Sequence, residues 1–156
     1  MMRIDRRTML HLATGAAVLP LMGARAAVPA ATMTMWRDPG CGCCVEWAKR
    51  MEAAFGARMQ VVNTADMTAV KRARGVPDDL WSCHTAMVRS VVVEGHVPPE
   101  DIKRLISSGP KSLVGLAVPG MPAGSPGMDI GHDHKQRYQV VAFGPGGRRA
   151  IFATHG

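Results

Sequence analysis

The stretch MTMWRDPGCGCCVEW, residues 33–47, joins a short apolar run to a tight turn and then to three closely spaced cysteines. Met33 to Trp36 predicts a strand, and Asp38-Pro39-Gly40 predicts a turn. A helix is expected to begin near Cys41 or Cys43 and to end at Gly56, since glycine accepts the left-handed backbone that closes helices. Its apolar residues recur at helical spacing and would face a core: Cys44, Trp47, Ala48, Met51 and Phe55.

The remaining pattern alternates strands and helices before it changes character. The expected elements are a strand at 59–62, a helix at 65–74, strands at 85–88 and 91–94, and a helix at 99–107. Residues 115–137 are rich in glycine and proline and predict a long loop, and residues 138–143 and 149–154 predict a hairpin. A strand followed at once by a cysteine-bearing helix start is typical of thioredoxin-like proteins. We therefore expect an α/β, thioredoxin-like fold: a central mixed sheet flanked by helices, with a C-terminal Gly/Pro/Met loop and a β-hairpin.

Length and composition favour one ordinary globular domain. The chain has 156 residues, of which 47% are apolar and 20% charged. No stretch approaches 18 consecutive apolar residues, so no membrane span is expected in the mature chain. Of the formal charge of +7, the first 26 residues carry +3, which leaves +4 on the rest of the chain. The one local basic cluster, Lys71, Arg72 and Arg74, is interpreted as a solvated helix face. Nucleic acid is therefore not an expected partner.

The first 26 residues have the form of an export signal. A positive segment precedes a short, mildly apolar segment, and Ala24-Arg25-Ala26 has the form of a cleavage site. The pair Arg6-Arg7 fits a twin-arginine signal, and an ordinary secretory signal fits equally well. The prediction is a signal peptide at 1–26 cleaved near Ala26, a linker at 27–32, and a single thioredoxin-like metal-binding domain at 33–156 in the periplasm.

Four cysteines form the principal candidate site. Cys41, Cys43 and Cys44 stand at a predicted helix N-terminus, where free backbone N–H groups and the helix dipole favour thiolates. In a thioredoxin-like fold, the loop before the strand expected at 85–88 faces this helix start, and that loop carries Cys83. The topology therefore predicts that four sulfurs converge on one spot.

Further metal ligands are available from two other groups of residues. Crowded thiolates suit several soft ions, and Cu(I) prefers thiolate and thioether ligands. The long loop offers the thioethers of Met121 and Met128, whose alternative role is to fill gaps in the core. His84 and His96 are either ligands or structural histidines bonded to backbone. His132-Asp133-His134 is either a solvated loop or a site for a divalent or oxidised ion.

Several runs together resemble the CopG-like family of periplasmic, thioredoxin-like copper-resistance proteins, long catalogued as a domain of unknown function. They include Trp36 to Trp47, Lys71-x-x-x-Gly75-Val76-Pro77, Ser82-Cys83-His84-Thr85-Ala86, Glu94-Gly95-His96-Val97-Pro98, Gly115 to Pro122 and Gly124 to Met128. The likeness covers about residues 33–153. Where relatives often carry Gly-Tyr after the Cys-His-Thr strand, this chain has Arg89-Ser90-Val91.

This resemblance implies copper as the bound metal, held as Cu(I) at a cysteine-rich site, with a multinuclear cluster as one form. It also implies a role in copper resistance, by handing copper on or by interconverting Cu(I) and Cu(II). Matched by position, the sulfur ligands are Cys41, Cys43, Cys44 and Cys83, and the motif residues Met121, Met128, His84 and His96 join them. Copper ions are the expected partners, and periplasmic copper oxidases or efflux components are candidate protein partners.

Two other functions stay open from the sequence. The Cys41/Cys44 pair forms a C-x-x-C motif at a helix start, which fits a thiol–disulfide oxidoreductase with Cys43 or Cys83 as the resolving thiol. A structural zinc or iron–sulfur module is the third alternative, although structural zinc sites prefer two separated C-x-x-C knuckles.

Overall fold

The structure of the protein, a computed structural model, describes residues 33–109, 112–129 and 135–156. The predicted signal peptide, the linker at 27–32 and the pair His132 and His134 lie outside the described residues. Within them, no helix combines enough length and apolar character to cross a membrane.

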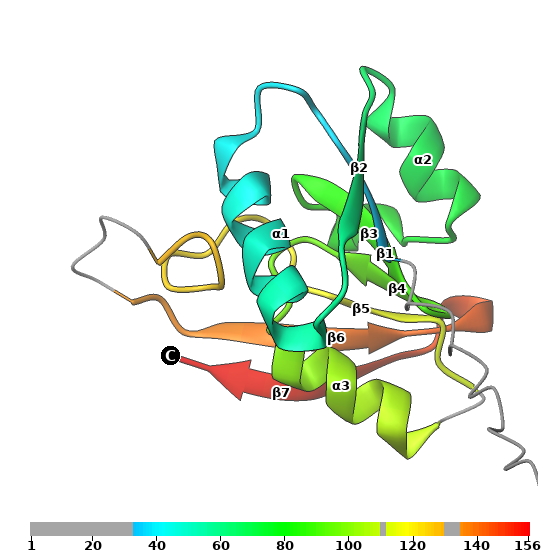
Figure 1. The fold of residues 1–156 in the computed structure, drawn as a ribbon. Helices are drawn as coiled ribbons and strands as arrows, with labels where there is room; N and C mark the ends of the chain where they lie inside the picture. Colours follow the sequence, from blue (N-terminus) through cyan, green and yellow to red (C-terminus); the bar gives the residue numbers. More distant parts are fainter. Residues whose placement is uncertain (1–32, 110–111, 130–134) are drawn as a thin grey trace, which may run out of the picture.

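One mixed sheet of seven strands forms the centre of the described structure, in the order β2-β1-β3-β4-β5-β6-β7 (Figure 1). Strand β1 pairs in parallel with β2 and antiparallel with β3, which pairs antiparallel with β4. This half of the sheet agrees with the expected thioredoxin-like arrangement, and the α/β fold class is confirmed. The strands are β1 (Met33–Arg37), β2 (Met59–Asn63), β3 (His84–Val88), β4 (Val91–Glu94), β5 (Gly115–Ala117), β6 (Tyr138–Phe143) and β7 (Arg149–His155).

Helices cover both faces of this sheet. The helices α1 (Gly42–Phe55) and α3 (Pro99–Ser108) lie on the same face in Figure 1, and α2 (Met67–Ala73) packs against β1 and β3. The expected apolar stripe of α1 is correct, because Cys44, Trp47, Ala48 and Met51 are all buried. The helix ends at Gly56 with φ 62°, the left-handed cap that the sequence predicted.

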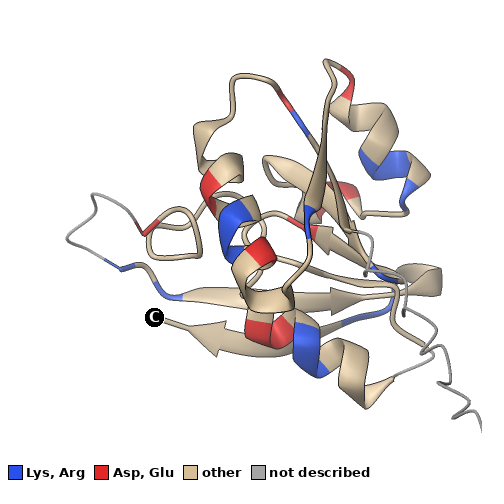
Figure 2. Ribbon diagram, in the orientation of Figure 1, with Lys and Arg blue, Asp and Glu red and all other residues tan. Residues whose placement is uncertain are grey.

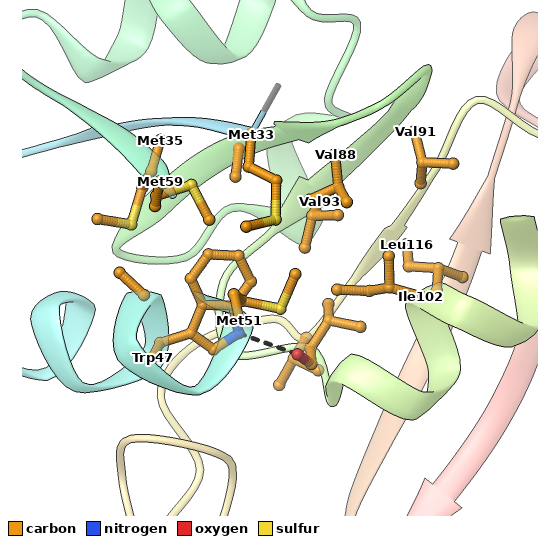
Figure 3. Packing of buried hydrophobic residues seen from close by; sticks show 14 of the residues in the cluster. Met33, Met35, Trp47, Met51, Met59, Val88, Val91, Val93, Ile102 and Leu116 are labelled. Carbon is orange, nitrogen blue, oxygen red and sulfur yellow. Dashed lines mark hydrogen bonds between the residues drawn. The ribbon is translucent and has the colours of Figure 1, made fainter. Parts of the chain in front are cut away.

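The core between the sheet and the helices α1 and α3 is rich in methionine. Met33 and Met35 from β1, Met51 from α1 and Met59 from β2 are all buried around Trp47 (Figure 3). The Trp47 indole N–H donates to the Val97 carbonyl at 2.9 Å, so its polar edge is satisfied inside the core. Flexible thioethers fill irregular space well, which suits a helix that packs across a twisted sheet.

The sequence-based expectation for residues 115–117 was wrong, because they form β5 rather than part of a loop. Strand β5 lies between β4 and β6, and all three of its residues are buried. A Cβ at Gly115 would meet the Val92 carbonyl and lie 2.6 Å from Phe143 Cζ, so glycine is needed there. The predicted hairpin is present, and β5 joins it to the main sheet as β6 and β7.

The interpretation of the basic cluster also needs a correction. Figure 2 shows basic residues along α2, but Lys71 is only 4% exposed and points into the protein. Arg72 and Arg74 stay at the surface, where they stack on Trp81 and Trp36 at 5.7 and 4.2 Å from the ring centroids. The face of α2 is therefore only partly solvated.

Candidate metal centre

The first part of the site is the N-terminus of α1. Cys41 is the N-cap residue and has extended backbone, and its N–H donates to the Asp38 carbonyl at 3.1 Å. The Arg37 guanidinium donates to the Cys41 carbonyl at 2.6 Å, which attaches the cap to the end of β1. The turn predicted at residues 38–40 thus places the first cysteine where free helix N–H groups begin.

Four cysteine sulfurs lie within 4.8 Å of one another, as the topology predicted. Cys41 and Cys44 are joined by a disulfide, with Cα atoms 5.7 Å apart. The two free thiols flank opposite ends of this bond. The Cys43 sulfur is 3.4 Å from that of Cys41, and the Cys83 sulfur, from the loop before β3, is 3.6 Å from that of Cys44.

A second group of ligand atoms shares Cys83 with the first. The Cys83 sulfur lies 3.2 Å from His84 Nδ1 and 3.0 Å from His96 Nε2. His96 Nδ1 is 2.8 Å from the Pro126 carbonyl oxygen, which can only accept. His96 Nδ1 therefore carries the hydrogen, and its Nε2 presents a lone pair to Cys83. The Nε2 atom of His84 is buried and has no hydrogen-bond partner.

Burial keeps this second group uncharged when no metal is bound. Loss of solvent raises the pKa of the Cys83 thiol to about 12, and the nearby Cys43 adds to the rise. Burial lowers the pKa of His84, with a further contribution from His96, and burial also lowers the pKa of His96. At neutral pH the imidazoles are neutral, which is the form that binds metals, and a metal ion on Cys83 would replace its proton.

The Gly/Pro/Met loop packs against both parts of the site. A Cβ at Gly127 would lie 2.9 Å from the Cys43 carbonyl oxygen and 3.4 Å from His96 Nδ1. Met128 follows directly and is partly buried. At the other end of the loop, the Gly120 carbonyl accepts a hydrogen bond from the Ser82 hydroxyl. Met121 is 53% exposed beside this contact.

Comparisons with known proteins find two similar solved structures and one matching family model. Two solved structures, both of a copper resistance protein, CopG, in Form 2 and Form 1, are 42% and 43% identical to this chain. Each match covers 81% of this chain and has a TM-score of 0.74, and they cover 99% and 98% of those chains. The chain belongs to the CopG family. Residues 80–128 of this CopG family member also match the family described as "Protein of unknown function, DUF411". The comparison with curated proteins gives no match.

Sequence reasoning missed one buried polar group behind the site of this CopG family member. The Lys71 ammonium pairs with the Glu94 carboxylate, which is fully buried at the end of β4. Burial raises the pKa of Glu94, and the Lys71 charge opposes that rise. Both residues stand in the family runs quoted above. A lysine beside two arginines on an amphipathic helix nevertheless gives no sign of burial, and its partner is distant in sequence.

Proposed function

We propose that this chain is an exported copper-resistance protein that binds Cu(I) at Cys41, Cys43, Cys44 and Cys83 in the periplasm. One observation carries the proposal: four sulfurs from two separate segments lie within 4.8 Å of one another. Thiolates that crowd this closely can bridge several soft ions, and Cu(I) is one of the ions that thiolate and thioether ligands select. The copper-resistance title of its structural relatives supports copper over zinc.

Nitrogen and thioether ligands extend this proposed centre. His84 and His96 would offer neutral imidazole nitrogens to copper bound at Cys83, because their nitrogens lie at 3.2 and 3.0 Å from its sulfur. Met128 and Met121 would offer thioethers from the loop that packs over the cluster. Imidazole also suits Cu(II), so the same centre could hold copper in both oxidation states.

The Cys41–Cys44 disulfide supports a redox role for the centre. Oxidation of the two thiols to a disulfide releases two electrons and two protons. Two Cu(II) ions, taking one electron each, would become two Cu(I) ions. Cys43 and Cys83 remain as thiols beside the new disulfide and would hold the reduced product.

Anaerobic titration of the reduced mature protein with Cu(I), with metal counted by elemental analysis, tests the proposal. We expect more than one copper per chain and a lower count in Cys83→Ser. Met87→Leu, a substitution on β3, the strand that follows Cys83, leaves the sulfur cluster intact; it is the matched control and should keep the full count. A mature protein that binds no Cu(I) above background would refute the proposal.

A thiol–disulfide oxidoreductase is the second candidate, because each sulfur of the disulfide has a free thiol beside it. Such an enzyme would reduce insulin without any metal and would lose turnover in Cys41→Ser. Metal-free turnover together with no tight copper would favour this function over the first.

A further inference from the structure

The Glu94 carboxylate lies behind the sulfur cluster at the centre of a closed hydrogen-bond network. Its Oε1 atom accepts from the Lys71 ammonium and, at 2.6 Å, from the backbone N–H of Ser82. Its Oε2 atom accepts from the Thr85 hydroxyl at 2.6 Å, and that hydroxyl in turn accepts from Lys71 at 3.2 Å. Each polar atom of this network therefore has a partner without any solvent.

The network holds the segment that carries Cys83. Strand β3 begins at His84, which pairs with Arg37 of β1. Ser82 lies outside this ladder and forms an isolated parallel bridge with Gly120. Glu94 supplies the acceptor that a neighbouring strand would otherwise give to the Ser82 N–H. On the far side of Cys83, the Gly95 N–H donates to the His84 carbonyl at 2.9 Å.

Close packing adds to these bonds. Gly95 has φ 70°, and a Cβ there would lie 2.6 Å from the Ser82 Cβ. Glu94 and Gly95 thus contact the residues on both sides of Cys83. The other three cysteines lie at the N-terminus of α1, with Cys41 as its N-cap, and this end is anchored separately through Trp47 and Arg37. The position of Cys83 relative to Cys44 therefore depends on the segment that Glu94 holds.

Stability alone is a poor reason for this arrangement. A buried ion pair recovers little more than the cost of removing its charges from water, and an apolar pair of similar volume is often as stable. An apolar side chain, however, cannot accept the Ser82 N–H. The specific effect of the network is therefore to fix the backbone of Ser82, one residue before Cys83.

We propose that Glu94, neutralised by Lys71, is a positioning residue that holds Cys83 against Cys44 and so sets the geometry of the sulfur centre. This inference deepens the proposed function and rests on it for its biological meaning. It concerns hydrogen-bond geometry: Glu94 Oε1 accepts from both the Lys71 ammonium and the Ser82 N–H.

Two double variants separate the acceptor from the charge. Lys71→Met with Glu94→Gln removes both charges and keeps a side-chain oxygen for the Ser82 N–H. Lys71→Met with Glu94→Leu removes the charges and the acceptor together. Asp101→Asn is the matched control, because this buried carboxylate on α3 pairs with His155 and Arg104 and, within the described residues, with none of the cysteines. The control therefore reports general loss of stability.

The first measurement needs no metal. In a Cys41→Ser, Cys43→Ser background, only Cys44 and Cys83 remain, and one oxidised glutathione converts their two thiols to a disulfide while releasing two reduced glutathiones. We expect the Leu variant to lower this equilibrium constant by about tenfold, the effect of losing one buried hydrogen bond, and the Gln variant to stay near the parent. The Asp101→Asn control should leave the constant unchanged.

The second measurement is Cu(I) affinity in the four-cysteine proteins, by competition with a chromophoric chelator. The Leu variant should bind about tenfold more weakly than the Gln variant. Equal constants for the Leu and Gln variants in the glutathione assay, or an equal drop in the Asp101→Asn control, would overturn the inference. If the parent protein binds no Cu(I), the proposed function fails, and the glutathione assay still decides the positioning role.

A milder substitution covers the case in which the Leu variant does not fold. Thr85→Val removes the donor to Oε2 and the hydroxyl that accepts from Lys71, and it leaves in place the two bonds that Glu94 Oε1 accepts from Ser82 and Lys71. A drop in the glutathione constant, smaller than tenfold but outside error, is expected because the carboxylate loses one of its restraints. No change in a folded Thr85→Val protein would count against the network as the source of the Cys83 position.

Discussion

Replacing Gly127 with alanine should separate the loop from the start of α1. Gly127 has φ 88°, where an L-residue is strained by about 1–2 kcal/mol. The added Cβ would lie 2.9 Å from both the Cys43 carbonyl oxygen and the Trp47 backbone nitrogen. Neither backbone atom can move without bending the first turn of α1, so the loop must shift and overpacking should cost about 1–3 kcal/mol more.

Gly120→Ala is the matched control for this prediction. Gly120 has φ 67° in the same loop, but a Cβ there would have no neighbour within 4 Å. This control should therefore show the backbone strain without the steric contact. The difference between the two free energies of unfolding measures how much the packing of the loop against α1 contributes to stability.

Urea unfolding of both variants and of the parent measures these energies. We expect Gly127→Ala to lose about 1–3 kcal/mol more than Gly120→Ala. Cu(I) affinity should also fall further in Gly127→Ala, because the Pro126 carbonyl that orients His96 belongs to the displaced segment. Equal unfolding energies and equal affinities for the two variants would refute the proposed seating of the loop.

Three further outcomes follow from single residues. Trp47→Phe leaves the Val97 carbonyl without its buried donor and should lower the free energy of unfolding by about 1–3 kcal/mol in urea titrations. The Cys83 thiol, with its pKa raised to about 12, should react far more slowly with iodoacetamide at pH 8 in the folded oxidised protein than in urea, and rapid labelling at pH 8 would contradict this. Because the unfolded thiol ionises at a lower pH than the folded one, the free energy of unfolding should decline as pH rises from about 8.5 toward 12. Arg89→Gly should raise the midpoint of thermal unfolding, because Arg89 has φ 56° in the β3–β4 turn and glycine relieves about 1–2 kcal/mol of backbone strain there. This relief should exceed the stability lost through the entropy that glycine adds to the unfolded chain. An unchanged or lower midpoint would contradict the prediction.

Local features of the chain were predicted well from sequence because they depend on neighbouring residues. The stripe of α1 and its cap at Gly56 follow from helical spacing and from the conformational freedom of glycine. The hairpin follows from its glycine-rich turn. Strand β5 could not be found in this way, since three residues that begin with a glycine show no alternation, and only pairing with β4 and β6 makes them a strand.

The candidate site was also predicted in part from the sequence. The chemistry of its ligands was readable at once, because three cysteines at a helix start and a fourth before a strand are properties of the sequence itself. Topology also gave their convergence, since an assumed strand order places Cys83 opposite the helix. The roles of the cysteines, methionines and histidines in binding metal stay predictions.

Spacing, capping and ligand type act over a few residues, so the helices, most of the strands and the soft character of the site could be predicted from the sequence. The groups that surround the sulfurs depend on contacts between distant segments. Strand pairing brings Glu94 beside Thr85, and the loop packing brings Pro126 to His96. Lys71 became a buried cation for the same reason: its partner lies 23 residues away, and long-range register, rather than local propensity, brings the two together.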